Sequence, residues 1–139
     1  MMFQISRDDT RRLSADASLA DRVILVTGAA RGLGAVISEE LESARALVVR
    51  ADIAGTEVSA DISTSEGNLE MVSYALREYG RIDGLVLNAG IQHVETIATF
   101  PETAWDRLHS VMLRGPFLGL QAAWSALSAS SLGRAVIVS

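Results

Sequence analysis

Short apolar runs alternate with longer amphipathic stretches over most of the chain. Buried parallel strands are predicted where Val, Ile, Leu and Ala dominate, in the segments VILVT (23–27), ALVVRAD (46–52), IDGLVLNAG (82–90) and AVIVS (135–139). A shorter and more polar segment, EVSADIS (57–63), is predicted to be an edge strand. Apolar residues at helical spacing predict helices over 33–44, 66–79 and 102–127.

The inner faces of the predicted helices follow from the same spacing. In the first helix this face contains Val36, Ile37 and Leu41, and in the second it is a stripe of Leu69, Val72, Ala75, Leu76 and Tyr79. In the long helix 102–127 the apolar side contains Trp105, Leu108, Val111, Met112, Leu118 and Trp124, and Pro116 is expected to kink the helix. Another apolar surface of this helix is a predicted contact for a homo-oligomer.

Strands that alternate with helices predict one α/β domain over residues 22–139, preceded by a flexible N-terminal extension over 1–21. Right-handed crossovers give a doubly wound parallel sheet, and the usual winding gives the Rossmann-like strand order 3-2-1-4-5. Ligands bind such sheets at the carboxyl ends of the strands, where the winding reverses between strands one and four. Residues 27–34 and 88–90 follow these two strands, so we expect them to meet at one crevice.

Composition narrows the classes of protein. Apolar residues make up 49% of the chain and charged residues 21%, which is typical of a packed globular core. The formal net charge is -5 and Lys is absent, which excludes the basic face that nucleic acid requires. No apolar run approaches the roughly 20 residues of a membrane-spanning helix, and residues 1–22 have no secretory apolar centre. The chain has no cysteine, and we expect a soluble, cytoplasmic protein without a membrane partner.

The segment TGAARGLG (27–34) follows a predicted strand and opens a predicted helix. A pyrophosphate needs backbone N–H donors at close range, and Gly28, Gly32 and Gly34 remove the Cβ atoms that would prevent that approach. The alternative is an ordinary strand-turn-helix in which the glycines serve tight packing. His93 and His109 have no partner at ligand spacing, so no metal site is assigned.

Several segments together resemble the short-chain dehydrogenase/reductase family. TGAARGLG is similar to the family's TGxxxGxG, ADIS (60–63) to its adenine-contacting segment, and LVLNAG (85–90) to its NNAG segment, with Leu87 at the first Asn. WDRLHSVMLRGPFLGLQAA (105–123) and GRAVIVS (133–139) continue the resemblance. It implies an NAD(P)-dependent oxidoreductase that transfers a hydride between a nicotinamide cofactor and an alcohol or carbonyl substrate.

The resemblance also implies roles for individual residues in holding a dinucleotide. Asp52 would accept the adenosine ribose hydroxyls, Asp61 the adenine amino group, and the Ile62 backbone would bind the base. The remaining cofactor-binding residues it implies are Gly28, Arg31, Gly32, Leu33 and Gly34 near the pyrophosphate and Asn88, Ala89 and Gly90 beneath the ribose.

The choice between NAD and NADP depends on two residues. The Asp52 carboxylate would repel an NADP 2′-phosphate and favours NAD, whereas Arg31 is similar to a basic residue of NADP-using members. We give Asp52 the greater weight. Asp52 also fits a helix N-cap or a solvated loop acid, and Asn88 fits a turn residue whose amide bonds the backbone across the sheet.

The resembled enzymes perform catalysis with a tyrosine, a lysine, a serine and an asparagine. Met112 stands at the position of the asparagine, Ser139 borders the position of the serine, and the chain contains no Lys. The sequence is therefore predicted to be truncated after the fifth strand and inactive alone, with a small-molecule substrate bound only if a catalytic half is present. The alternatives are a catalytically inactive nucleotide-binding or interaction module and an inert truncated product.

Overall fold

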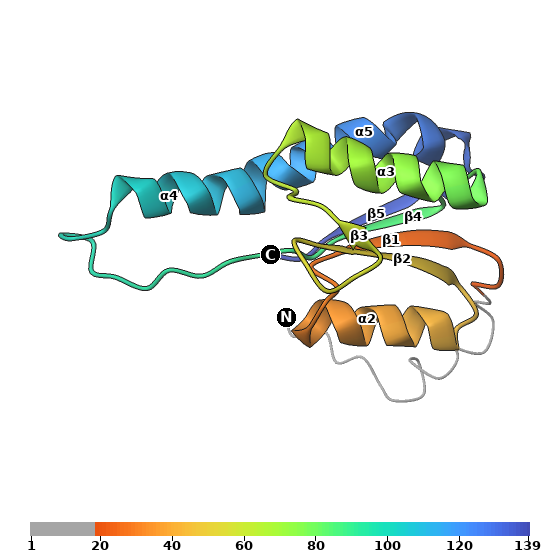
Figure 1. Cartoon of the computed structure of the whole chain (residues 1–139), viewed down its shortest axis with the longest axis horizontal. Helices are drawn as coiled ribbons and strands as arrows, with labels where there is room; N and C mark the ends of the chain where they lie inside the picture. The colour runs from red at the N-terminus through yellow and green to blue at the C-terminus, as the bar shows by residue number, and fades with distance from the viewer. Residues whose placement is uncertain (1–18) are drawn as a thin grey trace, which may run out of the picture.

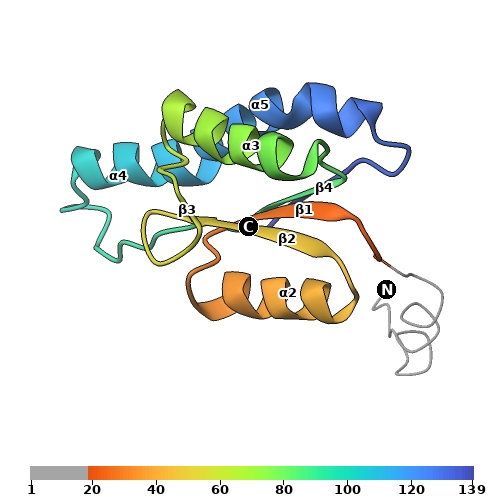
Figure 2. The ribbon, with the colours of Figure 1, turned by 45° about the vertical axis from the view of Figure 1, so that its right-hand side comes forward.

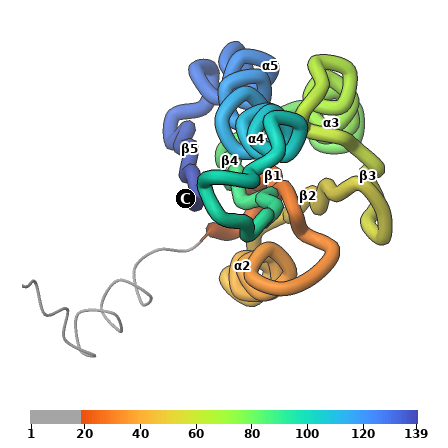
Figure 3. The backbone as a smooth tube through the Cα atoms, turned by 90° about the vertical axis from the view of Figure 1, so that its left-hand side faces the viewer, coloured from red at the N-terminus to blue at the C-terminus, as the bar shows by residue number. Residues whose placement is uncertain are grey.

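A computed structural model describes residues 19–139 and contains one parallel sheet. The strands are β1 (Val23–Thr27), β2 (Leu47–Asp52), β3 (Val58–Ser59), β4 (Gly84–Leu87) and β5 (Arg134–Ile137). Their order is β3-β2-β1-β4-β5 and every pairing is parallel, which confirms the predicted doubly wound topology (Figure 3). In the expected N-terminal extension, residues 1–18 lie outside the described residues, while Leu19 packs against the core.

Helices cover both faces of the sheet. The helical segments are α2 (Gly32–Ser43), α3 (Ser65–Tyr79), α4 (Glu102–His109), the π-helical turn η1 (Ser110–Arg114) and α5 (Gly115–Ala129). Helices α3 and α5 lie on one face and α2 on the other, whereas α4 extends past the end of the sheet (Figures 1 and 2). Within residues 19–139, no helix has both the length and the apolar character needed to cross a membrane.

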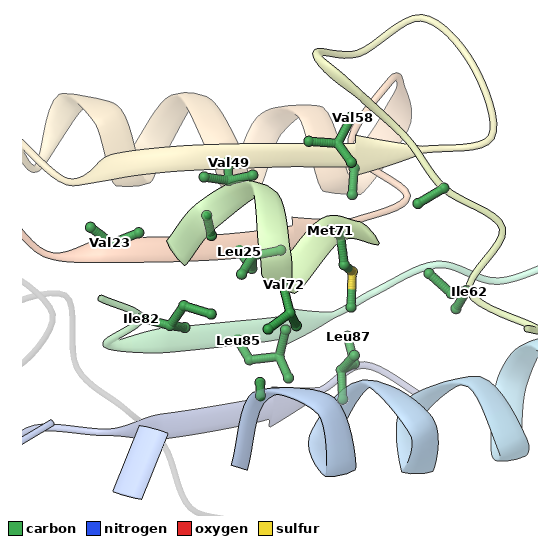
Figure 4. Packing of buried hydrophobic residues seen from close by; sticks show 14 of the residues in the cluster. Val23, Leu25, Val49, Val58, Ile62, Met71, Val72, Ile82, Leu85 and Leu87 are labelled. Atoms are coloured by element: carbon green, nitrogen blue, oxygen red, sulfur yellow. The ribbon is translucent and has the colours of Figure 1, made fainter. Parts of the chain in front are cut away.

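The larger part of the core lies between the sheet and the helix pair α3 and α5. Leu25 of β1 and Leu85 and Leu87 of β4 pack there with Met71 and Val72 of α3 (Figure 4). A smaller cluster lies on the opposite face, which α2 covers, and contains Ile24, Val26 and Val86. Alternate residues of β1 and β4 therefore enter different clusters, as the period of two in a strand requires.

The buried face of α3 differs from the predicted stripe. Val72 and Ala75 are buried as expected, but Leu69 is 56% exposed, and Leu76 and Tyr79 are also exposed. The inward positions are Asn68, Met71, Val72 and Ala75. The predicted stripe did not include Asn68, because the spacing rule counts only apolar residues as buried. Its side-chain amide is nevertheless buried, since it donates to carbonyl acceptors inside the protein.

The face of α2 also needs correction. Ile37 and Leu41 pack against the smaller cluster as predicted, whereas Val36 is 52% exposed. The residues of α2 that are buried are Gly34 and Ser38, and the Ser38 hydroxyl donates to the Gly34 carbonyl at 2.8 Å. Small residues four apart bring the helix close to the sheet, so the apolar side chains lie at the flanks of that contact.

The predicted long helix is interrupted by a π-helical turn. In η1 the Gly115 N–H donates to the Ser110 carbonyl, five residues back. Pro116 lies in the first turn of α5 and has no N–H. The α-helical bond from residue 116 to the carbonyl four residues back is therefore absent in any case, and the wider π turn at this point does not sacrifice it. The predicted apolar side is only partly correct, because Leu118 is buried but Trp105, Met112 and Trp124 are exposed.

Asp83 joins three elements at the amino end of β4. Its side chain is 3% exposed and accepts bonds from the Val23 N–H at 3.0 Å, the Ser130 hydroxyl at 2.6 Å and the Arg81 guanidinium at 2.6 and 2.8 Å. Burial alone would raise the pKa of Asp83, but the bonds from Arg81, Ser130 and Val23 hold that pKa well below its ordinary value. The carboxylate therefore ties β1 and the end of α5 to β4 as an ion.

We expect Asp83→Asn to lower the free energy of unfolding at pH 7 by about 2 to 4 kcal/mol, because it removes the charge that these donors stabilise. The folded-state pKa is depressed, so the contribution of Asp83 is fully present at neutral pH and declines progressively as the pH falls from about 4, the value for an unfolded Asp, toward the lower folded-state pKa. The deficit of Asp83→Asn should therefore be smaller at pH 3 than at pH 7. Urea unfolding at pH 7 and pH 3 measures this, with the exposed Asp106→Asn as control. An equal deficit at both pH values would contradict a role for the charge.

Candidate functional site

The carboxyl ends of β1 and β4 are joined by hydrogen bonds between Thr27 and the Asn88 segment. The buried Thr27 hydroxyl accepts the N–H groups of Asn88 at 3.0 Å and Ala89 at 3.1 Å. In return, the Asn88 side-chain amide donates to the Thr27 carbonyl at 3.1 Å and to the Gly28 carbonyl at 3.3 Å. The two sequence segments that were predicted to meet at one crevice are therefore in direct contact, and Asn88 has the cross-sheet structural role that the sequence left open.

Two glycines make this contact sterically feasible. Gly28 has φ +67°, and a Cβ there would lie 2.8 Å from the Ala89 Cα atom. A Cβ on Gly34 would overlap the Gly28 carbonyl and lie 2.6 Å from the Asn88 side-chain nitrogen. Gly28 therefore fits a left-handed turn against β4, and Gly34 lets the first turn of α2 pack directly on that turn.

The amino end of α2 faces the same crevice. Arg31 is the N-cap residue, has extended backbone geometry and makes no side-chain bond to the first-turn amides. Those amides have no intrahelical acceptor, and the helix dipole adds partial positive charge to them. The turn and the helix start therefore present N–H donors suited to an anion.

Asp52 ends β2 beside the glycine turn. Its Oδ2 accepts the Ala30 N–H at 3.0 Å and its Oδ1 accepts the Ile53 N–H at 2.7 Å. A carboxylate has about four acceptor positions, so these two bonds leave room for further donors. The carboxylate is held in place by backbone, and it is not a helix N-cap, because the cap of α2 is Arg31.

The loop after β3 supplies a second acid. Asp61 Oδ1 accepts both the N–H of Ser63 at 2.9 Å and its hydroxyl at 2.7 Å. The Thr64 side chain then caps α3 by accepting the Gly67 N–H at 3.0 Å. This loop is thereby fixed in shape between the edge strand and the start of the helix.

These segments enclose one cavity of about 540 Å³, a usual size for a small-molecule or cofactor site. It is lined by ten of the eleven residues predicted to bind a dinucleotide, namely Gly28, Arg31, Gly32, Leu33, Asp52, Asp61, Ile62, Asn88, Ala89 and Gly90. The eleventh, Gly34, does not line the cavity and packs against the turn instead.

Sequence reasoning missed part of the wall. Ile53, Ser63 and Ile91 adjoin predicted site residues, whereas Arg107, Ser110 and Val111 come from the distant helical segment α4 and η1. Their spacing of three and four residues puts the last three on one helical face. The sequence placed only Val111, on the apolar side of the long helix, and nothing local indicates that these three residues meet the cavity.

The positions tied to catalysis by the resemblance contain no acid-base group. Met112 approaches Gly90, where a Cβ would lie 3.8 Å from its Cε methyl, and Ser139 follows β5. Among residues 19–139, no three His, Cys, Asp or Glu side chains gather as metal ligands would. His109 Nδ1 lies 2.9 Å from the Trp105 carbonyl, and the His93 ring stacks edge-on against Phe100.

The sequence model of the family described as short chain dehydrogenase matches residues 54–139. The chain belongs to the short-chain dehydrogenase family. Among relatives in this family, it is 32% identical over 132 residues to the uncharacterized oxidoreductase YxjF of Bacillus subtilis, covering 83% of this chain and 51% of that protein. It is 31% identical over 137 residues to D-beta-hydroxybutyrate dehydrogenase of Cupriavidus necator, covering 86% and 53%.

Solved structures of other oxidoreductases, a dehydrogenase and a reductase, share the fold. The ligand-free aldohexose dehydrogenase of Thermoplasma acidophilum matches with a TM-score of 0.77 at 27% identity, over 81% of this chain and 46% of that one. The 3-ketoacyl-(acyl-carrier-protein) reductase of Brucella melitensis, complexed with NADH, matches with a TM-score of 0.75 at 30% identity, over 79% and 52%. The chain spans about half the length of these relatives.

We expect Thr27→Val to lower the free energy of unfolding by about 1 to 3 kcal/mol, because it leaves the Asn88 and Ala89 N–H groups without their acceptor. Thr27→Ser keeps the hydroxyl and is the matched control. Chemical unfolding measures the loss, and hydrogen exchange at the two amides locates it. An equal loss in both variants would assign the effect to packing of the Thr27 methyl group.

Proposed function

We propose that this chain is the NAD-binding half of a cytoplasmic oxidoreductase that transfers a hydride between the nicotinamide and an alcohol or carbonyl substrate. The observation that carries the proposal is the convergence of the glycine turn, Asp52 and the Asp61 loop on one cavity at the carboxyl ends of the strands. Dinucleotides bind doubly wound sheets at this place.

The residues around the cavity match the chemical groups of the dinucleotide in turn. The N–H donors of the Gly28 turn and of the α2 start suit the pyrophosphate, and the Asp52 carboxylate suits a ribose diol. Asp61 and the Ile62 backbone suit the adenine edge, while Asn88 to Gly90 form the floor beneath the second ribose. When bound, the nicotinamide accepts or gives up the hydride.

Asp52 supports NAD over NADP. A 2′-phosphate at the same ribose would lie within a few ångström of a carboxylate that is already fixed by two backbone bonds. At effective dielectrics between water and protein surface, this repulsion costs about 1 to 4 kcal/mol. Arg31 also lines the cavity and opposes this preference, but its guanidinium is equally suited to the pyrophosphate that both cofactors share.

The 139 residues contribute binding rather than proton transfer. They contain no Lys, and a Met occupies position 112, where the family resemblance places an asparagine. A positioned acid contributes about 10² to 10⁴-fold to a carbonyl reduction. We therefore propose that these residues alone bind NAD without measurable turnover, and that substrate binding requires further protein.

Calorimetric titration of the 139-residue chain is expected to show NAD binding about tenfold or more tighter than NADP, because only NADP meets the Asp52 carboxylate with a phosphate. Asp52→Asn removes that charge with little change of shape and should bring the NAD and NADP dissociation constants closer together. Asp106→Asn, on α4 outside the cavity, is the matched control and should leave their ratio unchanged. No heat with either cofactor on folded protein would refute the proposal, and tighter NADP binding would assign the choice to Arg31.

Self-association through the long helix, residues 102–127, is a further part of the proposal. Trp105, Leu113 and Phe117 are exposed there and line a shared groove, and clustered apolar surface marks interaction sites. Phe117→Glu should lower the mass measured by light scattering at micromolar concentration, because it places a charge in that groove. A wild-type mass equal to one chain would contradict this part.

A further inference from the structure

Asn68 is a buried polar residue at the start of α3, and its side chain is directed at the Asp61 loop. The residue is 1% exposed, and its Nδ2 donates to the carbonyls of Ile62 and Thr64, each at 2.7 Å. One amide group therefore holds two carbonyls of the loop that forms one wall of the cavity. Because each Nδ2 hydrogen has its own acceptor, the side chain has one orientation that fits.

Two residues around the junction of η1 and α5 hold the same loop from the other side. A Cβ on Gly115 would lie 2.9 Å from the Ile62 carbonyl oxygen, so α5 packs directly on the atom that Asn68 binds. The Arg114 guanidinium donates to the Ser63 carbonyl at 3.2 Å. The loop is thus fixed by α3, η1 and α5 together.

Asp61 and Ile62 of the fixed loop both line the cavity, and they carry an acceptor and a donor that no group in the described part of the chain occupies. Asp61 Oδ1 is occupied by Ser63, whereas Asp61 Oδ2 has no hydrogen-bond partner among residues 19–139. The Ile62 N–H likewise donates to no group in that range. Adenine carries an amino donor beside a ring-nitrogen acceptor, which matches this pair. Hypoxanthine carries a carbonyl acceptor beside a ring N–H, which is the reverse pattern.

The surroundings of Asn68 show that the donor nitrogen is what this position requires. Its Oδ1 is buried without a hydrogen-bond partner in the described part of the chain, and it faces Gly119 across the contact of α3 with α5. Rotating the amide would direct that oxygen at two carbonyl oxygens. The side chain therefore binds the loop through its nitrogen while its oxygen stays without a partner. Packing between the two helices alone does not explain a buried polar residue with an unsatisfied atom at this position.

We propose that Asn68 is a positioning residue for base recognition, which makes the chain select adenine-containing over hypoxanthine-containing dinucleotides. The inference rests on the proposed NAD site. Asn68 touches no ligand in this scheme, and it acts by fixing the direction of the Asp61 carboxylate and the Ile62 N–H.

The test compares the binding of ADP-ribose and inosine diphosphate ribose to the full chain by calorimetry. Wild type should bind ADP-ribose about tenfold or more tighter than inosine diphosphate ribose, because hypoxanthine would place its acceptor opposite the Asp61 carboxylate and its donor opposite the Ile62 N–H. Asn68→Leu, which keeps the branched outline of the side chain and removes the donors, should reduce the ratio of the two affinities below about threefold. Met71→Ala is the matched control, because it lies on the same buried face of α3 and should lower thermal stability while leaving the ratio unchanged.

Arg114→Ala is a second variant for the case that Asn68→Leu does not fold, because Arg114 is exposed and its loss removes a separate hold on the loop. It should reduce the ratio by about twofold at unchanged thermal stability. The inference is overturned if wild type binds both ligands equally, or if the folded variants keep the wild-type ratio. Absence of ADP-ribose binding to folded wild type would instead refute the proposed NAD site, and with it this inference.

Discussion

The hydroxyl of Thr27 accepts two N–H groups of the Asn88 segment, and these bonds join strand ends that lie about 60 residues apart in the chain. They hold β1 and β4 together at the point where the sheet reverses its winding. The glycine turn, the start of α2 and the residues at the floor of the cavity are therefore fixed relative to one another. Asp52 is attached to the same group of segments, because its carboxylate accepts the Ala30 N–H of the glycine turn. A buried hydroxyl at the end of a strand thus holds together segments that line the cavity.

The fold was predictable because its signals are local and repeat. Each buried strand is a short apolar run, each helix has a period near 3.6 residues, and right-handed crossovers leave few ways to connect them. The same reasoning explains why ten of the eleven predicted site residues line one cavity. They follow strand ends, and the carboxyl ends of parallel strands necessarily lie along one edge of the sheet.

What the sequence did not predict depends on contacts with distant segments. Asn68 was left out of the predicted inner stripe of α3 because it is polar, whereas its acceptors, the carbonyls of Ile62 and Thr64, are visible only in three dimensions. Val36 was placed inward for the converse reason, since the small residues Gly34 and Ser38 occupy the sheet contact. The contribution of Arg107, Ser110 and Val111 to the cavity depends on where α4 and η1 cross the sheet edge.

The π-helical turn η1 fixes the rotation of everything that follows it. An α-helix advances by about 100° per residue, and a π turn accommodates one residue more than an α turn does. The wide turn therefore absorbs one residue that would rotate α5 if the helix were α-helical throughout, and the buried residues of α5, among them Gly115, Leu118 and Gly119, keep facing the core. A one-residue deletion within Ser110–Arg114 would therefore let the turn close as regular α-helix with the buried face of α5 still directed at the core, whereas the same deletion inside α5 would rotate the residues that follow it by about 100°.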